Sequence, residues 1–167
     1  MWCRLDDIGD IITGGTPSKT NPDYYGDDYP FVKPADLDAG RNTRASKEYL
    51  SQLGMDVSRF VKKGATAVCC IGTIGKSGYL TTDCATNQQI NSIIPYINSL
   101  YLYYYCNSLF FINELRKDSS AVTISIVNKS KMEKITIPIP PIYEQERIVN
   151  QIEIIYKTLN SIEDILQ

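Results

Sequence analysis

The most regular hydrophobic pattern in the chain lies near its C-terminal end. Six aliphatic residues there are separated alternately by four and three positions: Ile148, Ile152, Ile155, Leu159, Ile162 and Leu166. This is the spacing of the a and d positions of a coiled coil, so a helix is predicted from about residue 143 to residue 167. Further apolar residues such as Val149 and Ile154 widen the apolar face. That width favours a partner helix, with packing of the helix on its own domain as the alternative.

Earlier in the chain, alternating or continuous apolar runs of strand length predict a series of short β-strands. They cover residues 31–33, 65–71, 79–81, 90–95, 122–126 and 135–139, and the prolines of the last run place it at a sheet edge. Helical spacing predicts a short helix over residues 46–53, ending at Gly54, and a longer one over residues 101–116. Residues 13–30 are too polar to pack a core, and a long loop of this kind usually carries function.

Composition excludes several classes of enzyme. The chain has 167 residues, enough for one domain with a hydrophobic core, and 43% of them are hydrophobic. It contains no histidine, which excludes Ser-His and Cys-His catalysis. Its five cysteines form no CxxC pair, so buried thiols are expected rather than a disulfide framework or a zinc site. No apolar run is long enough to cross a membrane and the first ten residues lack the features of a secretory signal, so a cytoplasmic protein is expected.

The charges are distributed unevenly along the chain. The net charge is −5 over residues 1–40, +6 over residues 41–134 and −3 over residues 135–167, which leaves −2 in total. A basic middle segment could present one positive face to the phosphates of a nucleic acid, or it could be a chance clustering of solvated side chains. If the segment binds DNA, its phosphate contacts are expected at Arg41, Arg44, Lys62, Lys63, Lys76, Lys129 and Lys131.

Three short motifs carry candidate chemistry, and each is weak by itself. Asn21-Pro22-Asp23-Tyr24 resembles the [DN]-P-P-[YF] motif of amino-methyltransferases, but its third residue is not proline and too few residues precede it for a cofactor-binding fold. The glycine turn at residues 72–78 is too short for a phosphate-binding P-loop. Either it brings backbone amides and Lys76 to a nucleic-acid phosphate, or it is a plain hairpin. The amides of residues 87–89 could pair with adenine edges, but such amides also cap turns.

Several segments gain meaning from their order along the chain. The chain opens with Trp2 to Gly15 and Thr16-Pro17-Ser18, and continues with Tyr24-Tyr25-Gly26, Phe31-Val32-Lys33-Pro34 and Asp36. The turn Gly72-Thr73-Ile74-Gly75 and the segment Asn87-Gln88-Gln89-Ile90 follow. The chain closes with Ile137-Pro138-Ile139-Pro140-Pro141-Ile142, Glu144-Gln145 and Ile148. In this order the segments resemble a target-recognition domain from the specificity subunit of type I restriction-modification systems.

The resemblance implies an α+β fold, in which a twisted mixed β-sheet with small helices is followed by one long C-terminal coiled-coil helix. It implies a target-recognition domain at residues 1–141 and a dimerisation or spacer helix at residues 142–167. The implied function is non-catalytic and needs no cofactor: the chain binds double-stranded DNA and directs an adenine methyltransferase subunit, and through it a restriction subunit, to a split site. The alternative is an interaction or decoy module that binds the methyltransferase subunit through the helix without reading DNA.

Members of this family usually carry two recognition domains and two long helices, whereas this chain has one of each. It is therefore either a half-length subunit or a piece of a longer one. A half-length subunit is expected to pair with itself or with another half through the six aliphatic positions of the helix, and two identical antiparallel copies would read an interrupted palindrome. Base readout is expected from one loop and two turns, with DNA contacts at Thr16, Ser18, Lys19, Tyr24, Tyr25, Lys33, Thr73, Lys76, Asn87 and Gln88.

Overall fold

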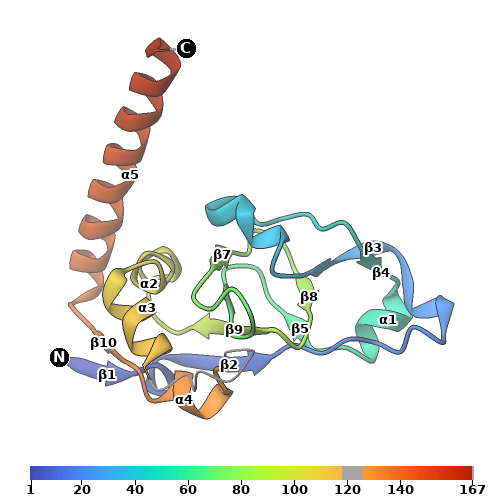
Figure 1. Ribbon diagram of the computed structural model, residues 1–167. Helices are drawn as coiled ribbons and strands as arrows, with labels where there is room; N and C mark the ends of the chain where they lie inside the picture. The colour runs from blue at the N-terminus through green and yellow to red at the C-terminus, as the bar shows by residue number, and fades with distance from the viewer. Residues whose placement is uncertain (118–125, 167) are drawn as a thin grey trace.

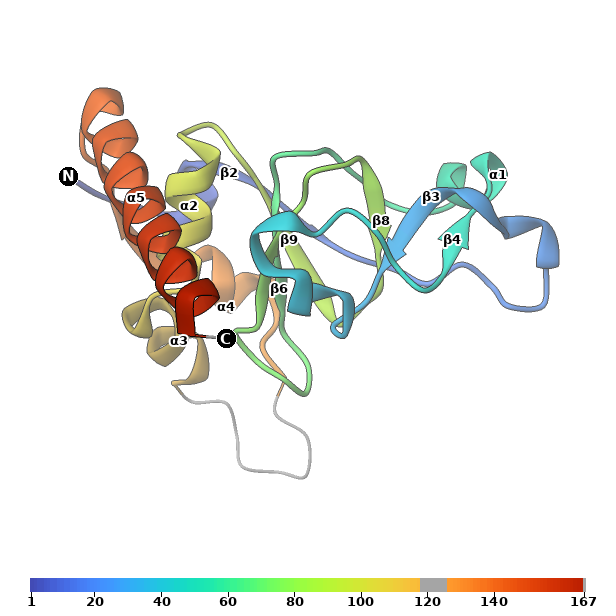
Figure 2. The same ribbon diagram turned by 90° about the horizontal axis from the view of Figure 1, so that it is seen from above.

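The computed structural model describes residues 1–117 and 126–166, and it shows a long helix standing on an elongated α+β body. Helix α5 (Ile142–Leu166) rises beside α2 (Ser99–Cys106) and α3 (Leu109–Arg116) at one end of the body (Figure 1). Strands β3 (Tyr25–Val32) and β4 (Tyr49–Leu50) and helix α1 (Gln52–Asp56) form the opposite end in both views (Figures 1 and 2). The molecule therefore has a helical end and a loop-rich end.

Within residues 1–117 and 126–166, the strands form three small sheets rather than one. The central sheet has the order β2-β9-β6-β7 and is antiparallel throughout, with β2 (Gly9–Thr13), β9 (Ile90–Pro95), β6 (Thr66–Cys69) and β7 (Ser77–Tyr79). A second sheet has the order β4-β3-β8-β5, with β8 (Cys84–Thr86) parallel to β3 and antiparallel to β5 (Phe60–Val61). Strands β1 (Trp2–Arg4) and β10 (Thr136–Pro138) pair with each other. The mixed α+β class is confirmed, and the single sheet is replaced by three.

Short helical segments complete the described chain. They are the 3-10 helices η1 (Leu5–Asp7), η2 (Pro22–Tyr24) and η3 (Asp36–Asn42) and the helix α4 (Lys129–Glu133). The largest core cluster lies where α2, α3 and α4 cover the central sheet, and it includes the fully buried Leu102, Phe111 and Met132. A smaller cluster around Phe31 and Leu50 supports the loop-rich end. Each end of the molecule thus has apolar support of its own.

Two of the predicted helices differ in the structure. Residues 101–116 form two helices, because Ser108 interrupts the helix and its Oγ accepts a hydrogen bond from the Phe111 amide (3.2 Å) as the N-cap of α3. The helix predicted over residues 46–53 is wrong: residues 49–50 are strand β4, and α1 begins only after Ser51, whose Oγ accepts from the Gly54 amide (3.1 Å). In both places a serine inside the predicted helix is instead the N-cap of the observed one.

Most of the predicted strands are present in the structure. Those at residues 65–71 and 90–95 are confirmed as β6 and β9, and the short runs near residues 31 and 79 lie in or beside β3 and β7. The proline-rich run is β10, which pairs only with β1 in the described part of the chain. The run at residues 122–126 falls outside the described residues except for Ile126, which forms a bridge with Ile71.

The predicted C-terminal helix is confirmed, and its first turns belong to the domain. Gln145 and Val149 are buried, and Ile148 packs against the largest core cluster. Beyond this region, Ile155 is 57% exposed, Leu159 50% and Ile162 48%. We call the row of six aliphatic positions the apolar seam of α5. The domain partly buries the start of this seam, and the part from Ile155 to Ile162 is exposed to solvent. No helix of residues 1–117 or 126–166 is long and apolar enough to cross a membrane.

Gly14 allows the chain to pass very close to the end of β8, and this close approach is open to test. A Cβ atom at Gly14 would lie 2.2 Å from the Asn87 carbonyl oxygen and 2.4 Å from that of Thr86, whereas a Cβ at Gly15 would meet nothing within 4 Å. Gly14→Ala is expected to lower the free energy of unfolding by about 2 to 3 kcal/mol, because backbone must move. The matched control Gly15→Ala should change it by less than about 0.5 kcal/mol. Urea denaturation of both variants checks this, and equal stabilities would contradict it.

Candidate nucleic-acid interface

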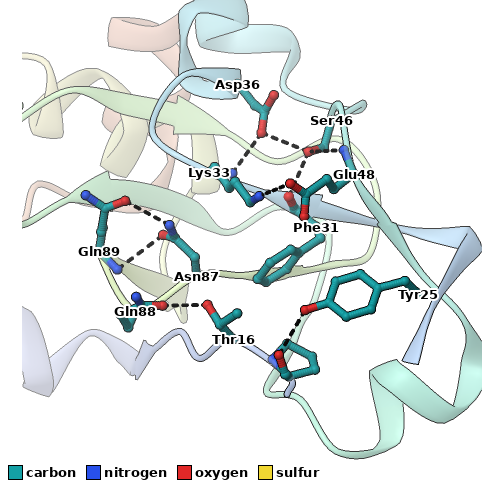
Figure 3. Close-up of polar contacts among 11 residues, drawn as sticks. Thr16, Tyr25, Phe31, Lys33, Asp36, Ser46, Glu48, Asn87, Gln88 and Gln89 are labelled. Atoms are coloured by element: carbon teal, nitrogen blue, oxygen red, sulfur yellow. Dashed lines mark hydrogen bonds and ion pairs between the residues drawn. The ribbon is translucent and has the colours of Figure 1, made fainter. Parts of the chain in front are cut away.

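The long polar loop between β2 and η2 lies against the turn that precedes β9. The Gly14 amide donates to the Ile90 carbonyl (2.9 Å) and the Gly15 amide to the Thr86 carbonyl (2.9 Å). The Thr16 hydroxyl then donates to Oε1 of Gln88 (2.5 Å), and Figure 3 shows the two side chains facing each other. Two of the three segments predicted for base readout are therefore joined, although more than 70 residues separate Thr16 from Gln88 in sequence.

Asn87 and Gln88 have different environments within this turn. Asn87 is buried: its Nδ2 donates to Oε1 of Gln89 (2.9 Å), and its Oδ1 accepts from the Gln89 amide (3.2 Å) (Figure 3). Gln88 is exposed beside Thr16. Asn87 thus shapes the turn, while Gln88 presents an amide to the outside.

The loop is held at its far side by Tyr25. The Tyr25 hydroxyl donates to the Pro17 carbonyl (2.9 Å), and its ring packs against the core cluster around Phe31 (Figure 3). Between these anchors, Ser18 and Lys19 are exposed, and the Ser18 and Thr20 hydroxyl oxygens lie 2.7 Å apart. The loop therefore has fixed ends and an exposed polar middle.

The Asn21-Pro22-Asp23-Tyr24 motif forms a single turn of 3-10 helix within the loop. Asn21 Oδ1 accepts a hydrogen bond from the Asp23 amide (3.2 Å), so the asparagine caps η2. Tyr24 is half-buried and gives its carbonyl to the Ser51 amide (3.1 Å). The motif thus joins the loop to α1.

Charged side chains of both signs meet beside this loop. Lys33 forms an ion pair with Glu48, and its Nζ lies 5.4 Å from the centroid of the Phe31 ring. The hydrogen bond from Lys33, followed by the nearby charges of Lys33 and Lys19, holds the pKa of the Glu48 carboxyl below its ordinary value. Lys47, which the sequence analysis missed, lines an open cleft together with Lys19 and Tyr25. Its signals in the sequence were its place in the basic middle segment and its position next to Glu48.

A second overlooked residue is Arg59, which lies after α1. Its Nη1 donates to the Thr13 carbonyl (2.8 Å) at the end of β2, where the polar loop begins. Arg59 is exposed, so its guanidinium lies at the surface next to the loop. Since Arg59 belongs to the basic middle of the sequence, only its contact with Thr13 distinguishes it from the other cations there.

The glycine turn follows β6 at the edge of the central sheet where the Gln88 turn precedes β9, since Cys69 pairs with Ile90 and the Cys70 amide donates to the Gln89 carbonyl (2.7 Å). Gly72 and Gly75 have φ values of 83° and 89°, which favour glycine, and a Cβ at Gly75 would lie 3.3 Å from Ile112 of α3. Thr73 at its tip is exposed, whereas the Lys76 ammonium is paired with Asp38 at 2.6 Å. The third predicted readout segment thus lies at the same edge of the central sheet as the Gln88 turn and packs against α3.

The remaining predicted phosphate contacts, taken together with Lys19 of the polar loop, fall into two groups. Arg41 pairs with Glu153 of α5, and Lys129 lies 3.5 Å from Glu133. The Lys131 ammonium is covered and has no hydrogen-bond partner among the described residues. A second group is exposed, and no ion pair joins it to any carboxylate in the described ranges: Lys19, Arg44, Lys62 and Lys63. Only the second group offers cations that are both exposed and outside any of these ion pairs.

The tyrosines of α2 are used for packing. Tyr101 donates its hydroxyl to the Pro138 carbonyl (2.7 Å) and Tyr105 donates to that of Thr136 (2.5 Å), which fastens β10 to α2. Tyr103 lies between Tyr79 and Tyr104, with ring centroids 5.9 and 5.3 Å away. These rings are occupied by protein neighbours.

The thiols and acids give no sign of a reactive or metal-binding centre. Burial raises the pKa of the Cys70 and Cys84 thiols to about 12, so both stay protonated at neutral pH. Across residues 1–117 and 126–166, no three histidine, cysteine, aspartate or glutamate side chains are grouped so that they could hold a metal ion.

Comparison with known proteins agrees with the resemblance seen in the sequence. The family model of the type I restriction modification DNA specificity domain matches residues 2–167. The chain is 40% identical over 93 residues to the HindI specificity subunit of Haemophilus influenzae, which covers 54% of this chain and 20% of that subunit. It is 28% identical over 151 residues to the MjaIX specificity subunit of Methanocaldococcus jannaschii, covering 87% of this chain and 35% of that subunit.

The fold has counterparts among solved structures. The HsdS subunit of Thermoanaerobacter tengcongensis superimposes with a TM-score of 0.77 at 20% identity, over 99% of this chain and 39% of that one. The chain thus spans less than half the length of each of these relatives. Because the family model covers nearly every residue, the chain belongs to the family of type I restriction modification DNA specificity domains.

Proposed function

We propose that this chain reads one part of a split double-stranded DNA sequence and directs an adenine methyltransferase subunit, with its restriction subunit, to that site. The observation that carries the proposal is the family match over residues 2–167. The loop-rich end supports it, because the exposed Thr16, Ser18, Lys19 and Gln88 gather there on fixed backbone. Hydroxyl, amide and ammonium groups are suited to the edges of bases in the major groove.

Phosphate contacts are assigned to cations that are exposed and not already paired. Lys19 belongs to the readout loop itself, and Lys62 and Lys63 precede β6. Since the chain has a net charge of −2, few phosphates can be neutralised at once, and binding by one copy is expected to be weak and sensitive to salt. Strong selectivity then requires a partner that holds the same duplex.

The partner surface is assigned to the exposed part of the apolar seam of α5, at Ile155, Leu159 and Ile162. With 25 residues the helix is about 37 Å long, close to the 34–36 Å of one DNA turn. Two copies joined by antiparallel helices would present two identical reading ends to the same side of the duplex in opposite orientations. They would recognise two short inverted half-sites separated by a fixed spacer.

The decisive experiment is to map methylated sites in cells that contain this chain as the only specificity component together with its methyltransferase subunit. An interrupted palindrome supports reading by two copies. A split but asymmetric motif supports reading together with a different half. Binding of the methyltransferase subunit without any selective methylation would refute the proposal in favour of a decoy.

The readout loop can be exchanged while its anchors stay in place. Residues 18–24 would be replaced by the corresponding loop of another family member, with Thr16, Pro17 and Tyr25 retained. The methylated sequence is expected to change, because loops carry recognition on a rigid frame. Tyr25→Phe is the control: it removes only the hydrogen bond to Pro17 and should weaken methylation without changing the sequence read. An unchanged motif after the exchange would contradict the assignment.

The unpaired cations can be tested by charge reversal. Replacing Lys19, Lys62 and Lys63 with glutamate is expected to weaken DNA binding at low salt and to reduce the slope of log K against log salt by about 1 for each phosphate that is no longer neutralised. Lys157→Glu on the exposed part of α5 is the matched control and should leave both quantities unchanged. Fluorescence anisotropy over a salt series measures them, and an unaltered triple variant would rule out these contacts.

The open part of the α5 seam can be separated from its buried part. Replacing Ile155, Leu159 and Ile162 with glutamine is expected to abolish self-association or binding of the methyltransferase subunit. The free energy of unfolding should change by less than about 1 kcal/mol, because these side chains are about half exposed. Val149→Ala, in the buried part, should instead cost about 2 kcal/mol. Sedimentation and urea denaturation distinguish the two, and unfolding of the triple variant would show that the whole seam is domain core.

A further inference from the structure

A cluster of polar and aromatic side chains joins α5 to the domain at Glu153. Nη1 of Arg41 donates to one oxygen of the Glu153 carboxylate, and the Tyr104 hydroxyl donates to the other. The Glu153 side chain is only 15% exposed. Burial and the hydrogen bond to Glu153 raise the pKa of Tyr104, which therefore keeps its proton and donates at neutral pH. The Tyr104 ring also stacks on Tyr156, with centroids 6.1 Å apart and an interplanar angle of 18°.

This cluster sits where α5 leaves the domain. Before it, Val149 is buried and Ile152 is half-buried. After it, Ile154 is 54% exposed and Ile155 57%. The contacts at Glu153 are therefore among the last that the domain can use to direct the helix.

The part of α5 beyond Glu153 converts a small change of angle at its base into a larger displacement at its end. From residue 154 to residue 166 it is about 20 Å long at 1.5 Å per residue. A tilt of about 10° at its base would move its far end by about 3.5 Å, which is close to the rise of one base pair. A small change in the angle of α5 at Glu153 would thus move the end of the helix by a distance comparable to one base pair.

The side chain that holds Glu153 comes from a firmly attached segment. Arg41 lies in η3, and the Asp36 and Asp38 carboxylates of η3 bind the Lys33 amide (2.8 Å) and the Lys76 ammonium (2.6 Å). The Thr43 hydroxyl closes the segment by donating to the Gly40 carbonyl (2.9 Å). Arg41 can therefore transmit the position of the sheets to the helix.

We propose that Arg41 and Glu153 are positioning residues that set the angle of α5, and so the length of the spacer accepted between two half-sites. This inference rests on the proposed function, since only a paired reader has a spacer. It gives Arg41 a role different from that of a phosphate contact. The two roles make opposite predictions for an exchange of charges, because a phosphate contact cannot be restored by changing Glu153.

The test is a charge-swap cycle in the methyltransferase complex. Arg41→Glu, Glu153→Arg and the double variant would be assayed for methylation of substrates that share the same half-sites and differ in spacer by one base pair. Each single variant is expected to lose about fivefold to tenfold of its preference for the wild-type spacer, and the double variant to regain most of it. Lys157→Glu and Asp164→Arg reverse the same charges farther along α5, on the side of the helix away from the seam, and should leave the preference unchanged.

The outcomes separate this inference from the proposed function. Rescue of the spacer preference in the double variant supports the positioning role. If Arg41→Glu weakens binding equally at all spacers and Glu153→Arg fails to rescue it, Arg41 is a phosphate contact and the inference is overturned. Unchanged spacer preference in both single variants overturns it as well, while leaving the proposed function intact. The proposed function is tested separately, by whether the complex with the wild-type chain methylates DNA at a selective sequence.

Discussion

The arrangement of the molecule depends on the buried side chain of Gln145. Its Oε1 accepts a hydrogen bond from the Asn98 amide (3.0 Å) and its Nε2 donates to the Pro140 carbonyl (2.9 Å), so one amide joins the start of α5 to the start of α2 and to the end of the proline-rich strand. Asn98 in turn caps α2 by accepting from the Tyr101 amide (3.0 Å). Because a buried amide must satisfy both its donor and its acceptor, this geometry tolerates little change. It holds the first turn of α5 against α2 and β10.

Two strands carry this fixed geometry to the loop-rich end. Strand β9 runs from the turn at Asn87 toward α2, and its antiparallel partner β2 runs from η1 toward the polar loop. Gly9 pairs with Pro95 near the helices and Thr13 pairs with Asn91 near the loop. The segments assigned to DNA and the helix assigned to a partner are therefore connected by paired backbone rather than by a flexible linker. Under the proposed positioning role, this connection would couple the angle of α5 to the DNA spacing that is read.

The cations of the basic middle segment do not all have the same surroundings. The basic middle of the sequence suggested a positive face, yet Arg41, Lys76 and Lys129 are engaged with carboxylates of the same chain. Their sequence neighbours Arg44, Lys62 and Lys63 are exposed and have none of these ion pairs. Ion pairing, long-range for Arg41 and Lys76 and within one helix for Lys129, thus divides one basic segment into a paired part and an exposed, unpaired part.

The sequence by itself determined the features that depend on local periodicity and local chemistry. The spacing of Ile148 through Ile162 specified the long helix, and the apolar runs specified β6 and β9, because helices and strands reveal their buried faces at short range. Only the tertiary structure decided that Thr16 meets Gln88, that Arg41 holds Glu153, and that the seam is closed at Val149 and open at Leu159. Each of these joins or covers residues far apart along the chain, and no local pattern records which distant side chain will be the neighbour.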